Sequence, residues 1–227
     1  LFYKDRNEEI IFFTNIKDLK FFNNENSNQQ LSSNFEIFNI PLKIKIINDL
    51  QNKNIFFEID SNKLRVNIKN DISYRDKNKT GLLVVNFFNK LNKIDYVVKE
   101  NSLIFKTNQN ETFNGKIDLK PFYLSSDLRL KQLDLFKIFD SDSILLNLLS
   151  TEVLNNQSLN AVVNVYLNKI KNTNYLNNIV LKTYFEEGNI VLKNSSLNWK
   201  NSILINLENV QIIVENNKII FTGGASF

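Results

Sequence analysis

The sequence contains no Cys, no His and no Met, and it has only 5 Gly, 2 Pro and 1 Trp. Without Cys, the chain has neither a disulfide framework nor a thiolate metal site. Without His, it lacks the commonest general base and metal ligand. A glycine-rich phosphate loop needs several glycines at set spacing, and the only adjacent pair is Gly223-Gly224. We therefore predict a non-enzymatic protein with no catalytic residue, no metal and no cofactor.

Long apolar runs are also absent. The longest, such as Ile10 to Phe13, have the length of a strand, whereas a membrane-spanning helix needs about 20 apolar residues. Because the chain starts at Leu1 and contains no Met, we expect it to be a piece of a longer protein. A signal peptide or membrane anchor would then lie upstream of it.

The charge is slightly positive but not clustered. The chain carries 28 Lys and Arg against 24 Asp and Glu, a net charge of +4, and its pI is about 9.0. Proteins that bind nucleic acid gather basic residues on one face, whereas Lys is spread along this whole chain between acidic residues. We therefore expect no nucleic-acid partner. The 43% of hydrophobic residues is enough to fill a core.

Most of the chain alternates apolar and polar residues, which is typical of strands with one buried face. Examples are the stretches 38–46, 55–59 and 64–68, and the pattern returns from Val163 to Phe221. Short polar turns separate the stretches, and such turns join antiparallel neighbours but cannot contain a parallel crossover. The sequence predicts an all-β fold, a long antiparallel meander of about 14 strands. Residues 1–227 should form a single unit, with a loop at 24–34.

One segment departs from this alternation. Between residues 133 and 155 the apolar residues fall at helical spacing, with Leu145, Leu148, Leu149 and Val153 on one face. Asp140 and Asp142 precede this face, and we interpret them as helix caps and not as the start of a calcium loop. We predict a helical insertion at 133–155 that contains an amphipathic helix at 143–155. The helix has almost no Lys, so we expect it to cover one end of the sheet, not a membrane surface.

Two other features have a plain structural interpretation. Glu186 and Glu187 are adjacent, so in a strand their side chains would point to opposite faces, and we interpret them with Gly188 as a turn. Trp199 lies in an alternating stretch, and we interpret it as a half-buried sheet residue and not as a ligand platform.

Two stretches resemble the AsmA-like family of envelope proteins, which includes the TamB and YhdP groups. The first runs from Gly115 to Phe122 and reads Gly-Lys-Ile-Asp-Leu-Lys-Pro-Phe. It continues into Asp127 to Phe139, which is similar to the family's strand followed by a bend toward a short helix. The second, Glu187 to Trp199, resembles the family's hairpins with an Asn-Ser turn. The resemblance covers about residues 113–227.

The resemblance implies a sheet curled into an open groove (β-taco-like) with an apolar inner surface along which phospholipid or another acyl lipid runs. It further implies intermembrane lipid transport or outer-membrane maintenance from the periplasm. The anchor would be an N-terminal helix, not present in this chain, in the inner membrane of a Gram-negative bacterium. The groove residues that we predict are Ile117, Leu119, Leu128, Leu130, Val163, Val165, Leu167, Ile179, Leu181, Phe185, Ile203, Ile205, Leu207, Ile212 and Val214.

Two alternatives remain open. The same alternation would build an ordinary β-sandwich or a closed barrel whose apolar face packs on itself, because periodicity does not distinguish a filled core from a lined groove. A surface adhesin or passenger-type β-protein that binds proteins or glycans through its polar face is the alternative function. Such proteins usually show internal repeats, and this sequence has no fixed repeat period.

Overall fold

The computed structural model describes residues 2–4, 10–24, 27–75, 79–87, 90–107, 112–134, 156–215 and 218–227. The described residues form strands, turns and bends and contain no helix, so the all-β prediction is confirmed for them. In chain order the strands are β1 (Phe2–Lys4), β2 (Ile10–Phe13), β3 (Asn15–Asn24), β4 (Asn28–Ile37), β5 (Ile40–Asp49), β6 (Asn54–Ser61), β7 (Val66–Ser73), β8 (Lys79–Phe87), β9 (Lys90–Lys99), β10 (Ser102–Thr107), β11 (Thr112–Leu119), β12 (Phe122–Leu133), β13 (Asn160–Ile170), β14 (Leu176–Glu186), β15 (Asn189–Leu192), β16 (Ser195–Trp199), β17 (Ile203–Glu215) and β18 (Lys218–Ser226).

The chain divides into two compact units. The first unit comprises Leu1–Asn108 and Asp118–Lys120, and the second comprises Gln109–Ile117 and Pro121–Phe227. The division falls inside β11, so each unit takes part of that strand.

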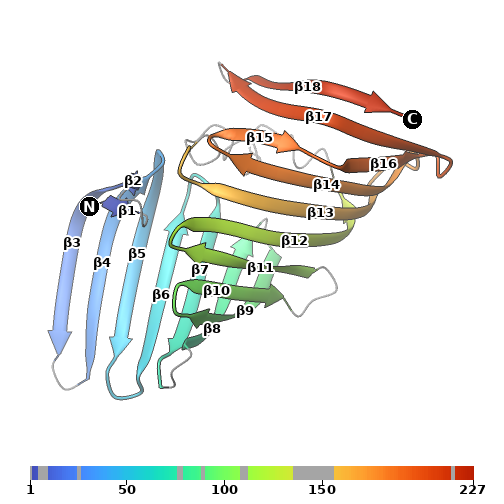
Figure 1. Ribbon diagram of the computed structural model, residues 1–227. Helices are drawn as coiled ribbons and strands as arrows, with labels where there is room; N and C mark the ends of the chain where they lie inside the picture. The colour runs from blue at the N-terminus through green and yellow to red at the C-terminus, as the bar shows by residue number, and fades with distance from the viewer. Residues whose placement is uncertain are drawn as a thin grey trace. The chain divides into compact units, whose positions relative to one another are not determined.

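The first unit is built on an antiparallel meander. Strands β3 to β10 follow one another in chain order, and each pairs with its predecessor (Figure 1). Strands β1 and β2 pair with each other in a separate two-stranded sheet. The turns between neighbours are short, as the sequence predicted, and this part of the meander is confirmed.

The second unit contains a mixed sheet. Strand β12 pairs with β13 in parallel, from Tyr123 opposite Asn160 to Leu133 opposite Ile170. After that point the pairing is antiparallel again. The two short strands β15 and β16 both pair with β14 and with β17, and β18 pairs with β17. The predicted antiparallel meander is therefore wrong at β12–β13. The chain between these strands, residues 134–159, exceeds the dozen residues that a parallel crossover requires.

Two further predictions concern single segments. The loop expected at 24–34 is wrong, because β3 continues to Asn24 and β4 begins at Asn28. Asn and Gln fill the start of β4, and their polar character masked the strand. The predicted helical insertion began at Leu133, which instead ends β12. Its remainder, 135–155, including the helix expected at 143–155, lies outside the described residues.

The hairpin turns show how a chain with few glycines makes tight connections. A two-residue type I′ hairpin needs positive φ at both central positions. In the β4–β5 turn these positions are Phe38 (φ 51°) and Asn39 (φ 60°), and in the β14–β15 turn they are Glu187 (52°) and Gly188 (79°). Phe38 is thus a turn residue, although the sequence placed it in the strand. The turn predicted at Glu186 to Asn189 is confirmed.

Few side chains are fully buried. The buried apolar residues are Ile40, Ile94, Tyr96, Phe105, Leu167, Ile170, Ile179, Ile190 and Leu192. In the second unit, Leu167, Ile170 and Ile179 form a cluster against which five half-buried leucines pack, namely Leu130, Leu133, Leu176, Leu181 and Leu197. In the second unit, burial is therefore concentrated around the β13–β14 pair.

Candidate functional site: the apolar sheet faces

One face of the sheet in the first unit is mostly apolar. Residues that lie opposite each other on paired strands point to the same face of a sheet. Following the register from β4 to β10 places one set of residues together: Leu31, Phe35, Ile37, Ile40, Leu42, Ile44, Ile46, Ile55, Phe57, Ile59, Val66, Ile68, Ile72, Leu83, Val85, Ile94, Tyr96, Val98, Leu103 and Phe105. We call this set the first apolar face. Its residues are buried or half-buried.

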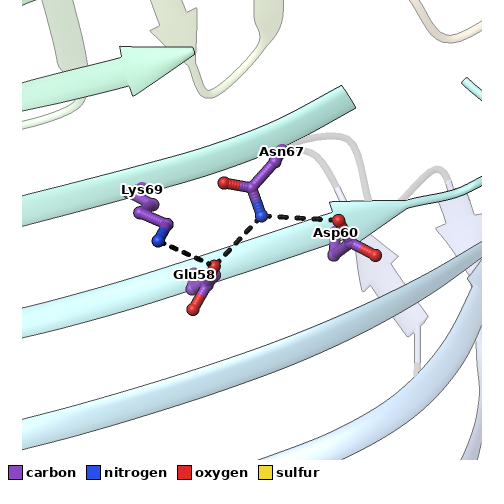
Figure 2. Close-up of polar contacts among 4 residues, drawn as sticks. All are labelled: Glu58, Asp60, Asn67 and Lys69. Atoms are coloured by element: carbon purple, nitrogen blue, oxygen red, sulfur yellow. Dashed lines mark hydrogen bonds and ion pairs between the residues drawn. The ribbon is translucent and has the colours of Figure 1, made fainter. Parts of the chain in front are cut away.

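The opposite face of the same sheet, which we call the polar face, carries most of the charged side chains together with some apolar ones, such as Phe56, Leu82 and Ile104. In Figure 2, Asn67 on β7 donates from Nδ2 to Glu58 Oε1 at 3.0 Å and to Asp60 Oδ1 at 3.4 Å, both on β6. Lys69 Nζ lies 3.4 Å from Glu58 Oε1. The Asn67 hydrogen bond, assisted by Lys69 and Lys45, holds the pKa of Glu58 below its usual value. Such cross-strand polar pairs suit a face turned to water.

The second unit also has one apolar face, and most of the predicted groove residues lie on it. The register places Leu128, Val165 and Leu181 side by side, and likewise Leu130, Leu167 and Ile179. Leu197 packs on the Leu167 cluster, and Ile205, which lies opposite Leu197 on β17, is therefore on the same face. The second apolar face comprises Leu124, Leu128, Leu130, Ala161, Val163, Val165, Leu167, Ile179, Leu181, Phe185, Ile190, Leu192, Leu197, Ile205, Leu207, Val210 and Ile212.

Four predicted groove residues lie at the margins. Ile203, the first residue of β17, is 47% exposed. Val214 lies near the end of β17, where it pairs with Ile219. Ile117 and Leu119 are half-buried in β11 beside the exposed Lys116, and the boundary between the two units passes between them. The structure therefore gathers eleven of the fifteen predicted residues on one face.

The described strands form single layers. Their substantial contacts are with hydrogen-bonded neighbours, and no second sheet packs face to face on the strands that the structure describes. A β-sandwich buries its apolar faces by packing two sheets about 10 Å apart. Within the described residues this packing is absent, so the side chains of both faces are mostly half-buried.

A glycine and a tyrosine interlock on the first apolar face. Gly81 on β8 lies opposite Tyr96 on β9. A Cβ added to Gly81 would overlap the hydroxyl oxygen and Cζ of Tyr96, so the tyrosine ring occupies the space that a side chain would need. Tyr96 is only 7% exposed, and burial raises the pKa of its hydroxyl. Aromatic residues commonly cover cross-strand glycines in this way.

We expect Gly81→Ala to destabilise the first unit by about 1–3 kcal/mol, because overpacking costs that much and the ring must move. The matched control is Gly224→Ala on β18, where the added Cβ would meet the nearest atom at 3.8 Å, an ordinary contact. Urea unfolding would measure both variants. Equal midpoints for Gly81→Ala and the wild type would show that Tyr96 does not occupy this space.

Buried polar side chains on the apolar faces differ in their hydrogen bonding. Ser33 donates to the carbonyl of Lys17 at 3.0 Å, and Ser61 donates to the carbonyl of Pro41 at 3.2 Å. Asn70, 1% exposed, makes no hydrogen bond of ordinary geometry within the described residues, but its amide lies close enough to the Tyr96 hydroxyl to oppose the rise in the pKa of that group. Most buried polar groups in proteins are hydrogen-bonded, which makes Asn70 an exception.

A hollow of about 830 Å³ lies on the polar face of the first unit. The register places Asp71, Asp95, Lys99 and Lys106, which line it, on the face opposite the first apolar face, and Arg75 lies beside them. Arg75 Nε donates to the carbonyl of Asn52 at 2.9 Å, which fixes the guanidinium at the rim. The hollow is therefore lined by both acidic and basic side chains, which can hydrogen-bond to a polar ligand.

Trp199, which the sequence predicted as a half-buried sheet residue, is the last residue of β16. It is 38% exposed and stacks on Tyr175, with ring centroids 5.7 Å apart and an interplanar angle of 19°. The amino group of Lys200 lies 5.5 Å from the centre of the Tyr175 ring. The pair closes one end of the β14–β16 pairing, where Leu176 faces Trp199.

Asp49 organises the turn between β5 and β6. Its carboxylate accepts from the backbone N–H of Asn52 at 2.9 Å, from the Asn52 side chain at 2.8 Å and from the backbone N–H of Gln51 at 3.0 Å. These hydrogen bonds, with that of the Asn52 backbone largest, lower the pKa of Asp49. A lowered pKa in the folded state means stabilisation that is present above the unfolded pKa, near 4, and is lost as pH falls through the folded value.

We therefore expect Asp49→Ala to lower the urea midpoint at pH 7 and to have a smaller effect at about pH 2, because the stabilisation is lost as pH falls through the folded pKa. Measuring the midpoints of wild type and variant at both pH values tests this. An equal difference at the two pH values would mean that the ionised carboxylate does not stabilise the turn.

No family model matches the chain, and no curated protein or solved structure matches it. Within the described residues, no helix has the length and apolar character needed to cross a membrane. The same residues contain no group of three or more acidic side chains arranged to hold a metal ion.

Three features of these faces were not predicted from the sequence. The predicted groove residues begin only at residue 117, although the alternation at 38–46 and 55–68 is typical of an equivalent face in the first unit. Nothing in the sequence distinguished Asn70 from the other 39 Asn. The hollow on the polar face combines residues from β6 to β10 and required the strand register to be found.

Proposed function

We propose that this chain is a non-enzymatic cell-envelope protein that holds acyl lipid along its apolar sheet faces. One observation supports the proposal above the others: each unit carries one face that is apolar from strand to strand, on a single layer that no second described sheet covers. An acyl chain laid on such a face would gain up to about 0.8 kcal/mol for each buried methylene. The opposite, polar face would remain in water.

The proposal extends to transport of phospholipid between membranes or to outer-membrane maintenance, in the periplasm. The resemblance of residues 113–227 to the AsmA-like family supports this extension, as does the absence of His and Cys from the sequence. In this proposal each sheet is curled into a groove, with acyl chains along the apolar residues and headgroups at the open edge. Anchoring would come from a segment outside this chain.

The proposal is tested by native mass spectrometry. The purified chain is first incubated with vesicles of phosphatidylethanolamine and phosphatidylglycerol. We expect folded protein that retains phospholipid, identified by organic extraction. A folded protein that remains free of lipid over a range of vesicle concentrations would contradict it. Circular dichroism on the same sample shows whether the strands are formed.

A second candidate function is a surface adhesin that binds glycans or proteins through its polar face. The hollow lined by Asp71, Asp95, Lys99 and Lys106 favours it, because charged and amide side chains there can hydrogen-bond to polar ligands. The wild type would then bind glycans on an array. Loss of this binding in Lys99→Ala, with binding kept in the apolar-face variant Ile205→Asp, would support the adhesin. Absence of glycan binding in a lipid-loaded protein would exclude it.

A further inference from the structure

One end of the sheet in the second unit carries exposed aromatic and apolar side chains. Trp199, the only Trp of the chain, ends β16, and its ring stacks on that of Tyr175, which directly precedes β14. Ile203 begins β17 opposite Trp199. Trp199, Tyr175 and Ile203 are 38%, 54% and 47% exposed. We call these three residues, together with Lys200, the aromatic end of the second unit.

Backbone hydrogen bonds hold the aromatic end in one arrangement. The N–H of Lys200 donates to the carbonyl of Tyr175 at 2.7 Å, which ties the turn after β16 to the turn before β14. The N–H of Ser202 donates to the carbonyl of Trp199 at 3.1 Å and closes the β16–β17 turn. Lys200 and Asn201 have the positive φ, 51° and 59°, that a two-residue type I′ turn requires. The exposed rings are therefore held in place before any partner binds, which lowers the entropy cost of binding.

The aromatic end continues the second apolar face. Leu176 lies opposite Trp199 and packs against the buried cluster around Leu167. Leu197, two residues before Trp199 on β16, packs against the same cluster. Side chains two residues apart in a strand share a face. An acyl chain laid on Leu197 therefore leaves the sheet past the Trp199 ring.

The same end is basic. The strand ends and turns that meet there are residues 131–134, 169–176 and 198–204. They contain four Lys and a single acidic residue, Asp134. Asp134 pairs with Lys171 at 3.4 Å, so it offsets one of the four positive charges. The turn at the opposite end of β14 instead carries Glu186 and Glu187, so the two ends of the strand differ in charge.

Exposed aromatic rings beside lysines match the surface of a lipid bilayer. Trp and Tyr settle at the level of the headgroups, where one part of the ring is in apolar surroundings and the other part is in water. A Lys side chain there keeps its methylenes against apolar groups and its amino group among the headgroups. The amino group of Lys200 already lies 5.5 Å from the centre of the Tyr175 ring. Each such cation is attracted to an anionic leaflet.

We propose that the aromatic end of the second unit docks on an anionic lipid bilayer, so that acyl chains pass from the bilayer past Trp199 onto the second apolar face. This inference rests on the proposed lipid-holding function and adds the partner that supplies the lipid. Trp199 and Tyr175 enter the headgroup layer, and Lys200 contacts the anionic headgroups. The end of β14 that carries Glu186 and Glu187 points away from the membrane.

Because Trp199 is the only Trp, its fluorescence reports on this end of the chain alone. The full chain is titrated with vesicles of phosphatidylcholine and phosphatidylglycerol, and separately with vesicles of phosphatidylcholine alone. With the anionic vesicles we expect the Trp199 emission to shift to shorter wavelength and to be quenched by lipids that carry bromine on their acyl chains. Binding measured by vesicle flotation should be at least about fivefold weaker without phosphatidylglycerol, the effect of one or more lysines near the surface.

Two matched pairs of variants locate the contact, and all four keep Trp199 as the probe. Lys200→Gln should weaken flotation with the anionic vesicles about fivefold, whereas Lys193→Gln should leave it within about twofold, because Lys193 lies beside the middle of β14. Tyr175→Ser should also weaken flotation. Tyr123→Ser should not, because Tyr123, although 39% exposed, lies at the opposite end of the β12–β13 pair. Circular dichroism shows that each variant keeps its strands.

The outcomes separate this inference from the function on which it rests. If the chain retains phospholipid in native mass spectrometry but vesicles leave the Trp199 emission unchanged, the lipid-holding function stands and the docking end is wrong. If the chain docks but retains no phospholipid, the docking end stands and the lipid-holding function fails. Equal flotation of the wild type and Lys200→Gln would overturn the role of charge. A Trp199 shift that needs no vesicles, produced by a soluble glycan or by rising protein concentration, would assign this end to a glycan or to a second copy of the chain.

Discussion

Replacing Ile205 with Asp is expected to weaken binding of an acyl-chain probe at least about tenfold, while Leu204→Asp leaves it within about twofold. Ile205 lies half-buried on the second apolar face opposite Leu197, whereas its neighbour Leu204 points to the other face and is 53% exposed. A carboxylate beneath an acyl chain must lose its water or take up a proton, which costs more than the 1.4 kcal/mol that separates tenfold affinities.

The two variants form a matched pair, because they add the same charge to the same strand one residue apart. Titration with a fluorescent fatty-acid probe measures both, and far-ultraviolet circular dichroism confirms that each retains its strands. Equal loss of binding in both variants would indicate a general electrostatic effect. Unchanged binding in Ile205→Asp would place the lipid elsewhere.

Leu167→Ala is expected to destabilise the second unit by about 2–5 kcal/mol, the usual cost of removing a buried leucine side chain. Leu167 is 4% exposed and packs with Ile170 and Ile179. Its neighbours come from β12, β14 and β16, so the cavity would loosen the parallel β12–β13 pair together with the antiparallel pairs beyond it.

Leu204→Ala is the control, since a side chain that is half exposed should cost under about 0.5 kcal/mol. Guanidinium unfolding followed by circular dichroism would give both values. A cost below about 1 kcal/mol for Leu167→Ala would mean that the β13–β14 cluster is not a packed core. The section around Leu167 would then be available to ligand along with the rest of the face.

The alternation of apolar and polar residues predicted most strands and the face on which they present their apolar residues. It worked because the side-chain period of a strand is two, whatever strand lies next to it. For the same reason it did not predict that β12 and β13 are parallel: Leu128 and Val165 would share a face in either direction. The connection between β12 and β13, residues 134–159, is long enough for a parallel crossover. Its apolar residues fall at helical spacing, so the sequence predicted a helical insertion there and not a parallel strand pair.

The other wrong predictions concern residue types that occur both in strands and in turns. Asn28 opens β4, although Asn is typical of turns, and the polar Gln29 and Gln30 follow it in the strand. Phe38 has the character of a strand residue but adopts the positive φ of a hairpin turn, because the chain has few glycines to offer. The burial of Asn70 could not be predicted either, because only the register of the strands places this residue between Phe57 and Leu83 on the first apolar face.

Photocrosslinking with a phospholipid that carries a diazirine on its acyl chain tests the central claim most directly. Peptide mapping should place the crosslinks on the apolar faces, at positions such as Leu83, Leu103 and Ile205, because the acyl chain would lie against them. The adjacent residues Leu82, Ile104 and Leu204 are exposed on the opposite face and should remain unlabelled. Labelling of both sets alike, or of the polar-face residues alone, would contradict a lipid-holding apolar face.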